Sequence, residues 1–307
     1  MRIRVLAATF AATAALLAGC GYDATPLPKP EEAASSPTQA ATPVECDNAT
    51  QSYAPSNDKG AALKQLINKG RLVVGVSGDT YKMGFTDPTD GELKGFDIAF
   101  AQEIAKALGV DLELRVILAS DRITMLDEGK IDMVARNMTV NCDRWTQVAF
   151  SSVYYNATQK VLVGSDEADK YTGPASLAGK RVCAPTATTS VANIKKIEPD
   201  VIAVEAANHT GCLIKFQNSE VDAITGDDTV LAGLAAQDPY TAVPKQEKLT
   251  DEPYGLAFNK DDVALVRFAN SVLDQMRADG RWTGIYDEWL KPTLKVDATP
   301  PAPAYGR

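Results

Sequence analysis

The sequence is poor in the residues that most enzyme active sites and metal centres need. It has a single histidine, His209, and five cysteines, none of which is spaced as a CxxC pair. No group of Asp, Glu and His has a metal-ligand spacing, no serine lies in a nucleophile elbow, and no glycine-rich loop could cradle a phosphate. We therefore expect no metal, no cofactor and no enzymatic activity.

Positive charge is also scarce. The chain has 31 Lys and Arg against 40 Asp and Glu, which gives a formal net charge of −9 at pH 7. An acidic balance of this kind argues against nucleic acid and against anionic lipid surfaces as binding partners. The expected partners are therefore small molecules or other proteins.

Long apolar runs are absent except at the N-terminus. Arg2 and Arg4 precede an apolar segment at 5–17, and Leu17-Ala18-Gly19-Cys20 ends it, as in an export signal. No other segment approaches the ~18 apolar residues that span a bilayer. The ending resembles the bacterial lipobox, which implies a signal peptide at 1–19, a lipid on Cys20 and anchorage at the outer face of the cell membrane. The alternative is an ordinary secretory signal with an incidental cysteine.

Two segments have few large apolar side chains. Residues 20–61 contain the lipidated Cys and a stretch of Ala, Pro, Ser and Thr that cannot bury a core, so we predict a tether. At roughly 3 Å per residue for an extended Pro-rich chain, it could hold the folded part some tens of Å from the membrane. Residues 293–307, which are rich in Pro and Ala, are predicted to form a flexible tail.

Four cysteines remain if Cys20 is lipidated, and an even number fits an oxidising compartment. Three pairings are possible. We favour Cys183 with Cys212 because both lie in the middle segment of the chain, which leaves Cys46 with Cys142.

About 250 residues are left for folding, enough for two lobes with their own cores. Short β-rich runs alternate with amphipathic helices, which predicts α/β lobes with mostly parallel sheets. Strands are expected at 72–76, 112–116 and 131–135. The apolar spacing over 98–108 predicts a helix, and Gly109 lies where it would end.

The segment Asn137-Met138-Thr139-Val140-Asn141-Cys142-Asp143-Arg144 follows the third of these strands. Arg144 offers two parallel N–H donors whose spacing matches a carboxylate, and Thr139 adds a hydroxyl and a backbone amide. We interpret the segment as a carboxylate-binding site. The alternative is a solvated surface arginine in a loop.

The segment Gly95-Phe96-Asp97-Ile98-Ala99-Phe100 resembles the signature of extracellular solute-binding proteins for polar amino acids that serve ABC importers. The family usually has a second acid where this chain has Ala99. The likeness extends from about residue 63 to residue 290. It includes Gly129-Lys130-Ile131-Asp132, Phe150-Ser151-Ser152-Val153-Tyr154-Tyr155, Glu220-Val221-Asp222-Ala223 and Tyr254-Gly255-Leu256.

The resemblance implies an α/β, two-lobed periplasmic-binding-protein-like fold of type II, with two crossover strands as the hinge. We place lobe one at 62–160 and 252–292, and lobe two at 161–251. The resemblance also implies a free amino acid as ligand, bound in the cleft between the lobes, and the permease and ATPase subunits of an ABC importer as partners.

The resemblance assigns Thr139 and Arg144 to the ligand α-carboxylate, and Asp227 to the α-ammonium. Asp228 is the alternative to Asp227, but the spacing favours Asp227. Thr188 and Thr189 lie in a segment similar to the family's Gly-Thr-Thr-Ser loop, with Ala187 in place of Gly. They could contact a ligand oxygen or simply cap the next helix.

Specificity for the ligand side chain is less marked in the sequence. Lys82 and Arg136 are the candidate cations for an acidic side chain, or else solvated charges. Tyr81 and Phe85 fall where the family often has an aromatic wall, although such residues are more often core. We predict capture of L-glutamate, or of aspartate, asparagine or glutamine. The alternatives are a sensor domain for a transmembrane signalling partner and a dehydratase-like enzyme on the same fold.

Overall fold

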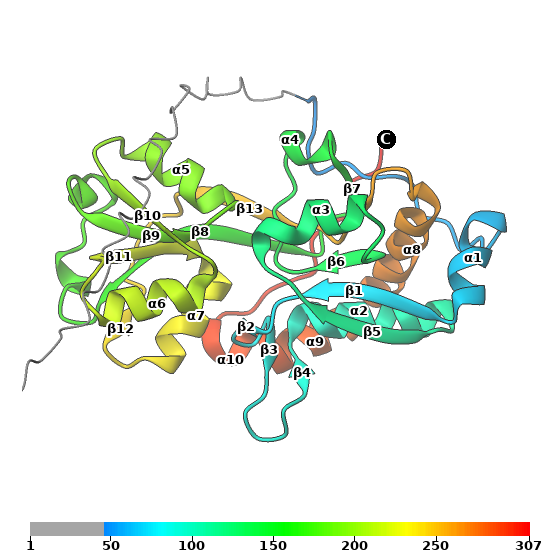
Figure 1. Ribbon diagram of the computed structural model, residues 1–307, viewed down its shortest axis with the longest axis horizontal. Helices are drawn as coiled ribbons and strands as arrows, with labels where there is room; N and C mark the ends of the chain where they lie inside the picture. Colours follow the sequence, from blue (N-terminus) through cyan, green and yellow to red (C-terminus); the bar gives the residue numbers. More distant parts are fainter. Residues whose placement is uncertain (1–45) are drawn as a thin grey trace, which may run out of the picture. The chain divides into compact units, whose positions relative to one another are not determined.

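Two open α/β sheets organise residues 46–307, the part of the chain that the computed structural model describes (Figure 1). The predicted signal peptide, Cys20 and the tether as far as residue 45 lie outside the described residues. Each sheet has helices packed against it and its own apolar core, so residues 46–307 form two lobes. None of the helices in this part of the chain is long and apolar enough to cross a membrane.

Lobe one is built on a five-stranded sheet with the order β5-β1-β6-β14-β7. Its strands are β1 (Arg71–Val76), β5 (Asp111–Val116), β6 (Met133–Ala135), β7 (Val148–Phe150) and β14 (Ala257–Asn259). Its helices are α1 (Ala61–Lys69), α2 (Phe96–Leu108), α3 (Arg122–Asp127), α4 (Cys142–Trp145), α8 (Val263–Asp279), α9 (Arg281–Trp289) and α10 (Lys291–Leu294), with a 3-10 turn at Ala119–Asp121. β1 is parallel to β5 and β6, whereas β14 is antiparallel to β6 and β7.

The local sequence explains the central elements of this lobe. β1 is a run of apolar residues buried on both faces, as expected for a parallel strand covered by helices. The α2 helix ends where Gly109 adopts a φ of 79° and donates its N–H to the carbonyl of Ala105. The predicted strands at 72–76, 112–116 and 131–135 and the predicted helix at 98–108 are confirmed, with boundaries shifted by one or two residues.

Lobe two is built on a sheet with the order β10-β9-β11-β8-β12, and β13 also pairs with β8. Its strands are β8 (Tyr155–Gly164), β9 (Arg181–Pro185), β10 (Ile202–Ala206), β11 (Ala223–Asp227), β12 (Thr241–Ala242) and β13 (Thr250–Tyr254). Its helices are α5 (Thr189–Ile197), α6 (His209–Gln217) and α7 (Asp228–Gln237), with 3-10 turns at Ala168–Lys170 and Pro174–Leu177. β9, β10 and β11 are parallel, so the carboxyl ends of these three strands lie at the same edge of the sheet.

The chain crosses between the lobes twice, through β8 and β13. These strands are antiparallel neighbours, and Tyr155 pairs with Tyr254 at the end nearest lobe one. The predicted lobe boundaries at 160/161 and 251/252 fall inside these two strands. The two-lobed α/β architecture with two crossover strands is therefore present, as the sequence predicted.

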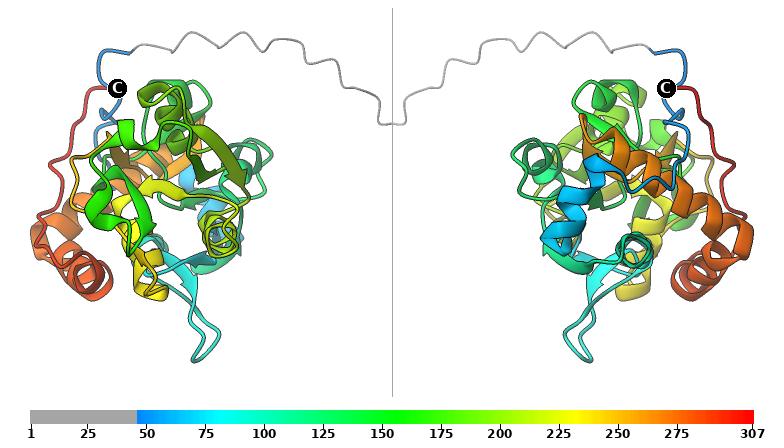
Figure 2. Two further views of the ribbon diagram at one scale, coloured as in Figure 1. Left: turned by 90° about the vertical axis from the view of Figure 1, so that its left-hand side faces the viewer. Right: turned by 90° about the vertical axis from the view of Figure 1, so that its right-hand side faces the viewer.

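A small three-stranded sheet belongs to lobe one and consists of β2 (Asp79–Thr80), β3 (Gly84–Thr86) and β4 (Leu93–Lys94). The β3–β4 hairpin projects away from the rest of lobe one in both side views (Figure 2). The turn between β2 and β3 lies beside lobe two, because a Cβ on Gly233 of α7 would come within 3.0 Å of the carbonyl oxygen of Tyr81.

The two disulfides are Cys46–Cys142 and Cys183–Cys212, which confirms the favoured pairing. Cys183 belongs to β9 and Cys212 to α6, so this bond joins a strand and a helix in the core of lobe two. The other bond joins the first described residue to α4, the helix that carries Arg144.

The segments at 46–60 and 295–307 both pack on lobe one, which corrects the predictions of a tether as far as residue 61 and of a flexible tail. Ser52 donates its backbone N–H to the carbonyl of Ala304 over 2.9 Å, and the Arg307 guanidinium lies 4.0 Å from the centre of the Trp145 ring. Composition indicates only that a segment lacks a core of its own. These segments gain backbone hydrogen bonds and ring contacts from residues far away in the sequence.

Candidate functional site

A small, nearly closed cavity lies between the two lobes and is lined by polar side chains from both. Lobe one contributes Ala119, Arg122, Arg136, Asn137, Thr139 and Arg144, and lobe two contributes Pro185, Thr188, Thr189, Ser190, His209 and Asp227. The free volume is about 10 Å³, roughly enough for one water molecule. Six of the residues predicted from the sequence are therefore brought together by the fold: Arg136, Thr139, Arg144, Thr188, Thr189 and Asp227.

The lobe-one wall is formed by the segment that follows β6. The backbone N–H of Asn137, a residue with a φ of 33°, donates to Oδ2 of the buried Asp97 over 2.8 Å. The Tyr154 hydroxyl donates to Oδ1 of the same carboxyl over 2.6 Å. Burial raises the pKa of Asp97 to about 6. The Asp97 side chain thus holds the segment that carries Thr139 in place.

The short helix α4 positions Arg144. The side chain of Asn141 caps the helix, because its Oδ1 accepts the backbone N–H of Arg144 over 2.9 Å. The Arg144 Nη1 atom donates to the carbonyl of Thr139 over 2.6 Å, which orients the guanidinium inside the cavity wall. Asn137, Thr139 and Arg144 of the predicted carboxylate-binding segment are therefore buried at the lobe junction, and Arg144 is not a solvated surface residue.

The lobe-two wall comes from residues at the carboxyl ends of β9 and β11. Thr188 precedes α5 and donates its hydroxyl to the carbonyl of Pro185 over 2.7 Å. Thr189 is the first residue of α5, where backbone N–H groups without helical partners favour a negatively charged ligand group. Asp227 is the last residue of β11.

Asp227 is 5% exposed, and its two carboxyl oxygens differ in their contacts. Oδ2 accepts the Tyr254 hydroxyl over 2.6 Å, whereas Oδ1 is buried and has no hydrogen-bond donor within residues 46–307. Burial, followed by the nearby charge of Glu252, raises the pKa of Asp227 to about 8. An ammonium group that reached Oδ1 would donate the missing hydrogen bond and would place a positive charge beside the carboxyl group. Asp228, the alternative, accepts the Thr158 hydroxyl instead and does not line the cavity.

Three guanidinium groups are buried in the wall, at Arg122, Arg136 and Arg144. Their Nε or Nη atoms donate to the carbonyls of Ala119, Ile117 and Thr139 respectively. Among the described residues, no carboxylate oxygen lies within 4.0 Å of these three groups. The pKa of each arginine is lowered, and burial is the largest cause in all three. Carbonyls orient the guanidiniums without neutralising them, so the cavity favours an anionic group.

His209 lies in the same wall, at the first turn of α6. Its Nε2 atom is buried and has no partner in the described part of the chain. Burial, and then the charge of Arg136, lowers the pKa of His209 to about 4. The imidazole is therefore neutral at physiological pH and adds no charge to the cavity.

Three of the predicted residues, Tyr81, Lys82 and Phe85, do not line the cavity. They lie in the β2–β3 segment, where the Lys82 ammonium is between 5.3 and 5.8 Å from the ring centres of Tyr81, Phe85 and Trp289. The Tyr81 and Phe85 rings contact each other edge to face at 5.1 Å. The positive charge of Lys82 is thus engaged by aromatic rings of lobe one.

The sequence singled out neither Arg122 nor His209 as a binding residue, whereas Asn137 and Ser190 lie in the two segments that it did indicate. Arg122 had no local signal, because a buried arginine and a solvated one look alike in a sequence. Its Nη2 atom lies 3.4 Å from the carbonyl of Ala187, so Arg122 also connects lobe one to lobe two. Ala187 has a φ of 59° and lies where the family has Gly, and with this backbone conformation its carbonyl faces Arg122.

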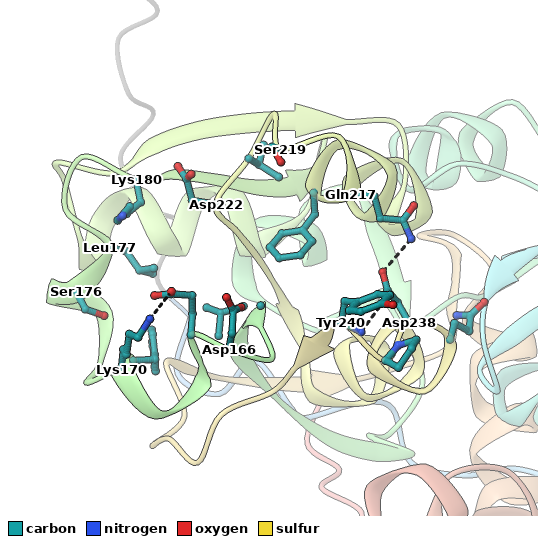
Figure 3. Close-up of a pocket in the computed structure, with 18 residues that line it drawn as sticks. Asp166, Lys170, Ser176, Leu177, Lys180, Gln217, Ser219, Asp222, Asp238 and Tyr240 are labelled. Carbon is teal, nitrogen blue, oxygen red and sulfur yellow. Dashed lines mark hydrogen bonds and ion pairs between the residues drawn. The ribbon is translucent and has the colours of Figure 1, made fainter.

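A larger cavity of about 980 Å³ lies within lobe two, away from the lobe junction (Figure 3). Three of its four acidic side chains already have partners: Gln217 donates to Asp238, Lys170 to Glu167 and Arg181 to Asp222. None of the predicted binding residues lines it. Within residues 46–307 no group of three His, Cys, Asp or Glu is arranged to hold a metal ion. The cavity at the lobe junction is therefore the candidate site.

Comparison with known proteins gives a family. A family model described as bacterial extracellular solute-binding proteins, family 3, matches residues 72–292. The ABC transporter glutamine-binding protein GlnH of Bacillus subtilis (strain 168) is 34% identical over 243 residues, which cover 78% of this chain and 88% of that protein. The glutamate-binding protein GluB of Corynebacterium efficiens is 28% identical over 246 residues, which cover 76% of this chain and 83% of that protein.

A solved structure has the same architecture. The ancestral amino acid-binding protein AncCDT-1, described as a precursor of cyclohexadienyl dehydratase, superposes with a TM-score of 0.70 at 31% identity. The match covers 75% of this chain and 100% of that one. The chain therefore belongs to the bacterial extracellular solute-binding proteins, family 3, as a two-lobed type II member of the kind that binds polar amino acids.

Proposed function

We propose that this protein captures a free polar α-amino acid, L-glutamate first, with aspartate, asparagine and glutamine as alternatives, and delivers it to an ABC importer by closing its lobes. One observation carries the proposal. Arg144 of lobe one and Asp227 of lobe two line the same buried cavity, and Asp227 Oδ1 has no hydrogen-bond partner among residues 46–307. Arg144 offers a positive charge to the carboxylate of a zwitterion, and Asp227, once it ionises, offers a negative charge to the ammonium.

The charge of the cavity supports an acidic ligand. Arg122, Arg136 and Arg144 contribute three buried positive charges, and Asp227 is the one acidic residue in the wall. Buried charges without ion pairs are costly, so a ligand with a second carboxylate gains more than a neutral one. Arg136 and Arg122 are the proposed partners of that side-chain carboxylate, in place of Lys82.

Closure follows from the position of the two charged groups. The zwitterion gains contacts with both lobes only when these are close together, so ligand favours the closed form through its differential affinity. We propose that the permease and ATPase subunits of the importer respond to this closed form. The similarity to the ABC transporter glutamine-binding protein GlnH of Bacillus subtilis supports this role over that of a sensor domain.

The N-terminal sequence supports anchorage by a lipid on Cys20 at the outer face of the cell membrane. Fractionation of cells that express the full chain should place it in the membrane fraction. Cys20→Ser should move the protein to the soluble extracytoplasmic fraction. Recovery of both forms in the soluble fraction would identify residues 1–19 as an ordinary secretory signal.

The test of the ligand is a thermal-shift screen of the purified chain against the twenty amino acids, followed by calorimetry. A ligand that binds the folded state raises the Tm in proportion to the logarithm of its excess over Kd. We expect the largest shift with glutamate or aspartate. If no amino acid raises the Tm, the proposal is overturned. If the protein removes water from a carboxylic acid that is a precursor of aromatic compounds, the dehydratase alternative is favoured.

The importer role needs a separate measurement. Deletion of the protein should reduce uptake of labelled glutamate by the cells, and the wild-type chain should restore it. Undiminished uptake together with tight binding in the purified protein would instead indicate the sensor role.

A further inference from the structure

Glu252 is a buried carboxylate immediately behind the candidate site. It belongs to the crossover strand β13, is 1% exposed and is not among the residues that line the cavity. Its Oε1 atom accepts hydrogen bonds from Asn193 Nδ2 over 2.8 Å and from Thr250 Oγ1 over 2.7 Å. These two donors belong to lobe two and fix the orientation of the carboxylate.

The other oxygen of Glu252 contacts two residues of the cavity wall. Oε2 accepts the Thr139 hydroxyl over 2.6 Å and the Thr189 hydroxyl over 2.7 Å. Thr139 belongs to lobe one and Thr189 to lobe two, and their Oγ1 atoms are 3.4 Å apart. The Glu252 carboxylate therefore joins the lobes through the two threonines that line the candidate site.

A threonine hydroxyl has one hydrogen to donate and two lone pairs that can accept. Because both hydroxyls donate to Glu252, neither has a proton left for a ligand carboxylate. Each can still accept a hydrogen bond from a ligand N–H. The carboxylate of the ligand is then left to Arg144 and to backbone N–H groups, and the two hydroxyls share the ammonium with Asp227 Oδ1.

We propose that Glu252 is a positioning residue that makes the site selective for an ammonium group, by turning the Thr139 and Thr189 hydroxyls into acceptors. The inference rests on the proposed amino-acid binding and explains why the site would require an ammonium group on its ligand. A dicarboxylate without an amino group would meet acceptors where it has no donor.

The test compares L-glutamate with glutarate, which has the same two carboxylates and carbon chain but no ammonium. Affinities are measured with the purified full chain, by calorimetry for glutamate and by competition for glutarate. The wild type should bind glutamate at least 100-fold more tightly. Glu252→Met removes both acceptor oxygens, frees the two hydroxyl protons and should reduce this selectivity at least tenfold, mainly by weakening glutamate binding.

Glu252→Gln is the matched variant, because it keeps one acceptor oxygen and the shape of the side chain. It should retain more of the selectivity than Glu252→Met. Thr189→Val keeps the shape of Thr189 without its hydroxyl, and it should also reduce selectivity if Glu252→Met does not fold. Glutarate binding that is no more than about threefold weaker than in the wild type shows that the site is intact in each variant.

Two results would overturn the inference in different ways. In the first case the wild type selects glutamate, and Glu252→Met and Thr189→Val either keep that selectivity or lose affinity for glutamate and glutarate equally. Glu252 then has a merely structural role, while the proposed function stands. If the wild type binds no amino acid, the proposed function fails and this inference fails with it.

Discussion

Arg144 and Asp227 show how single residues in this protein acquire a role from their surroundings. Neither is unusual in the sequence, where arginine and aspartate are common. Within residues 46–307, Arg144 is buried without an ion pair and one carboxyl oxygen of Asp227 has no donor. Both features cost free energy in the unliganded protein, and an amino acid would relieve both.

The first prediction at this scale concerns Arg144. Arg144→Ala should weaken the binding of every amino acid ligand about 100-fold or more, because a buried charge-assisted pair is worth about 2–5 kcal/mol. Lys82→Ala is the control, since its ammonium lies over aromatic rings outside the cavity, and we expect an affinity within about twofold of wild type. Calorimetry with glutamate and with glutamine measures both. Selective loss of glutamate binding in Lys82→Ala would restore Lys82 to the site.

The second prediction concerns the protonation of Asp227. In the closed form without ligand the Asp227 carboxyl has a pKa of about 8, so it is mostly protonated at pH 7, and an ammonium requires it to ionise. Binding at pH 7 should therefore release up to about 0.9 proton, and the affinity should rise with pH until it levels off above pH 8.

Calorimetry in two buffers of different ionisation enthalpy measures this proton release. Asp227→Asn is the control, because an amide in place of the carboxyl removes the ionisation and should abolish the release together with most of the affinity. A wild type that releases no proton at pH 7 would show that Asp227 is already ionised before the ligand arrives.

The elements of lobe one include two segments that composition alone describes incorrectly. Residues 46–60 and 295–307 lie against each other and against α8, where Arg277 donates to the Pro301 carbonyl and Tyr305 donates its hydroxyl to Asp274. The disulfide between Cys46 and Cys142 fixes the same region beside α4. These segments therefore belong to the folded unit that supports Arg144.

A truncation tests whether the C-terminal segment contributes to the stability of lobe one. Removal of residues 301–307 deletes the contacts with Ser52, Asp274 and Trp145, and we expect a loss of about 2 kcal/mol in the free energy of unfolding, or about 4–8 °C in Tm. Ligand affinity should stay within about threefold, because none of these residues lines the cavity. Differential scanning calorimetry provides the measurement. Arg307→Ala alone should cost only about 0.5–1 kcal/mol. An unchanged Tm in the truncated chain would mean that these residues form a flexible tail, as the sequence predicted.

The two lobes of residues 46–307 are in a closed form, because the free volume at the lobe junction is about 10 Å³ and hydrogen bonds from Arg122, Thr139 and Thr189 cross it. An amino acid cannot enter this space unless the lobes separate. The antiparallel pair β8 and β13 is the connection about which they would do so.

Small-angle X-ray scattering tests this motion. The radius of gyration of the purified chain should fall when saturating glutamate is added, because ligand shifts the population towards the closed form. Arg144→Ala should not respond at the same ligand concentration. An identical radius with and without bound glutamate, confirmed by calorimetry, would mean that the free protein is already closed.

The sequence by itself determined the local structure and much of the chemistry. Runs of apolar residues specified the strands, Gly109 specified the end of a helix, and the pattern of cysteines in an exported chain indicated both disulfides. These features depend on neighbouring residues or on spacing, so a linear pattern contains them. The order of short motifs was sufficient to indicate the family and its two-lobed fold.

The tertiary structure alone decided which charges are buried and which are paired. It placed Arg122 in the wall of the cavity and Glu252 behind that wall, and it placed Lys82 outside the wall. Among the described residues it left Oδ1 of Asp227 without a donor, and it folded the tail onto lobe one. The physical reason is the same in each case. Burial and hydrogen bonding depend on atoms within a few Å, and here those atoms come from residues far apart in the sequence.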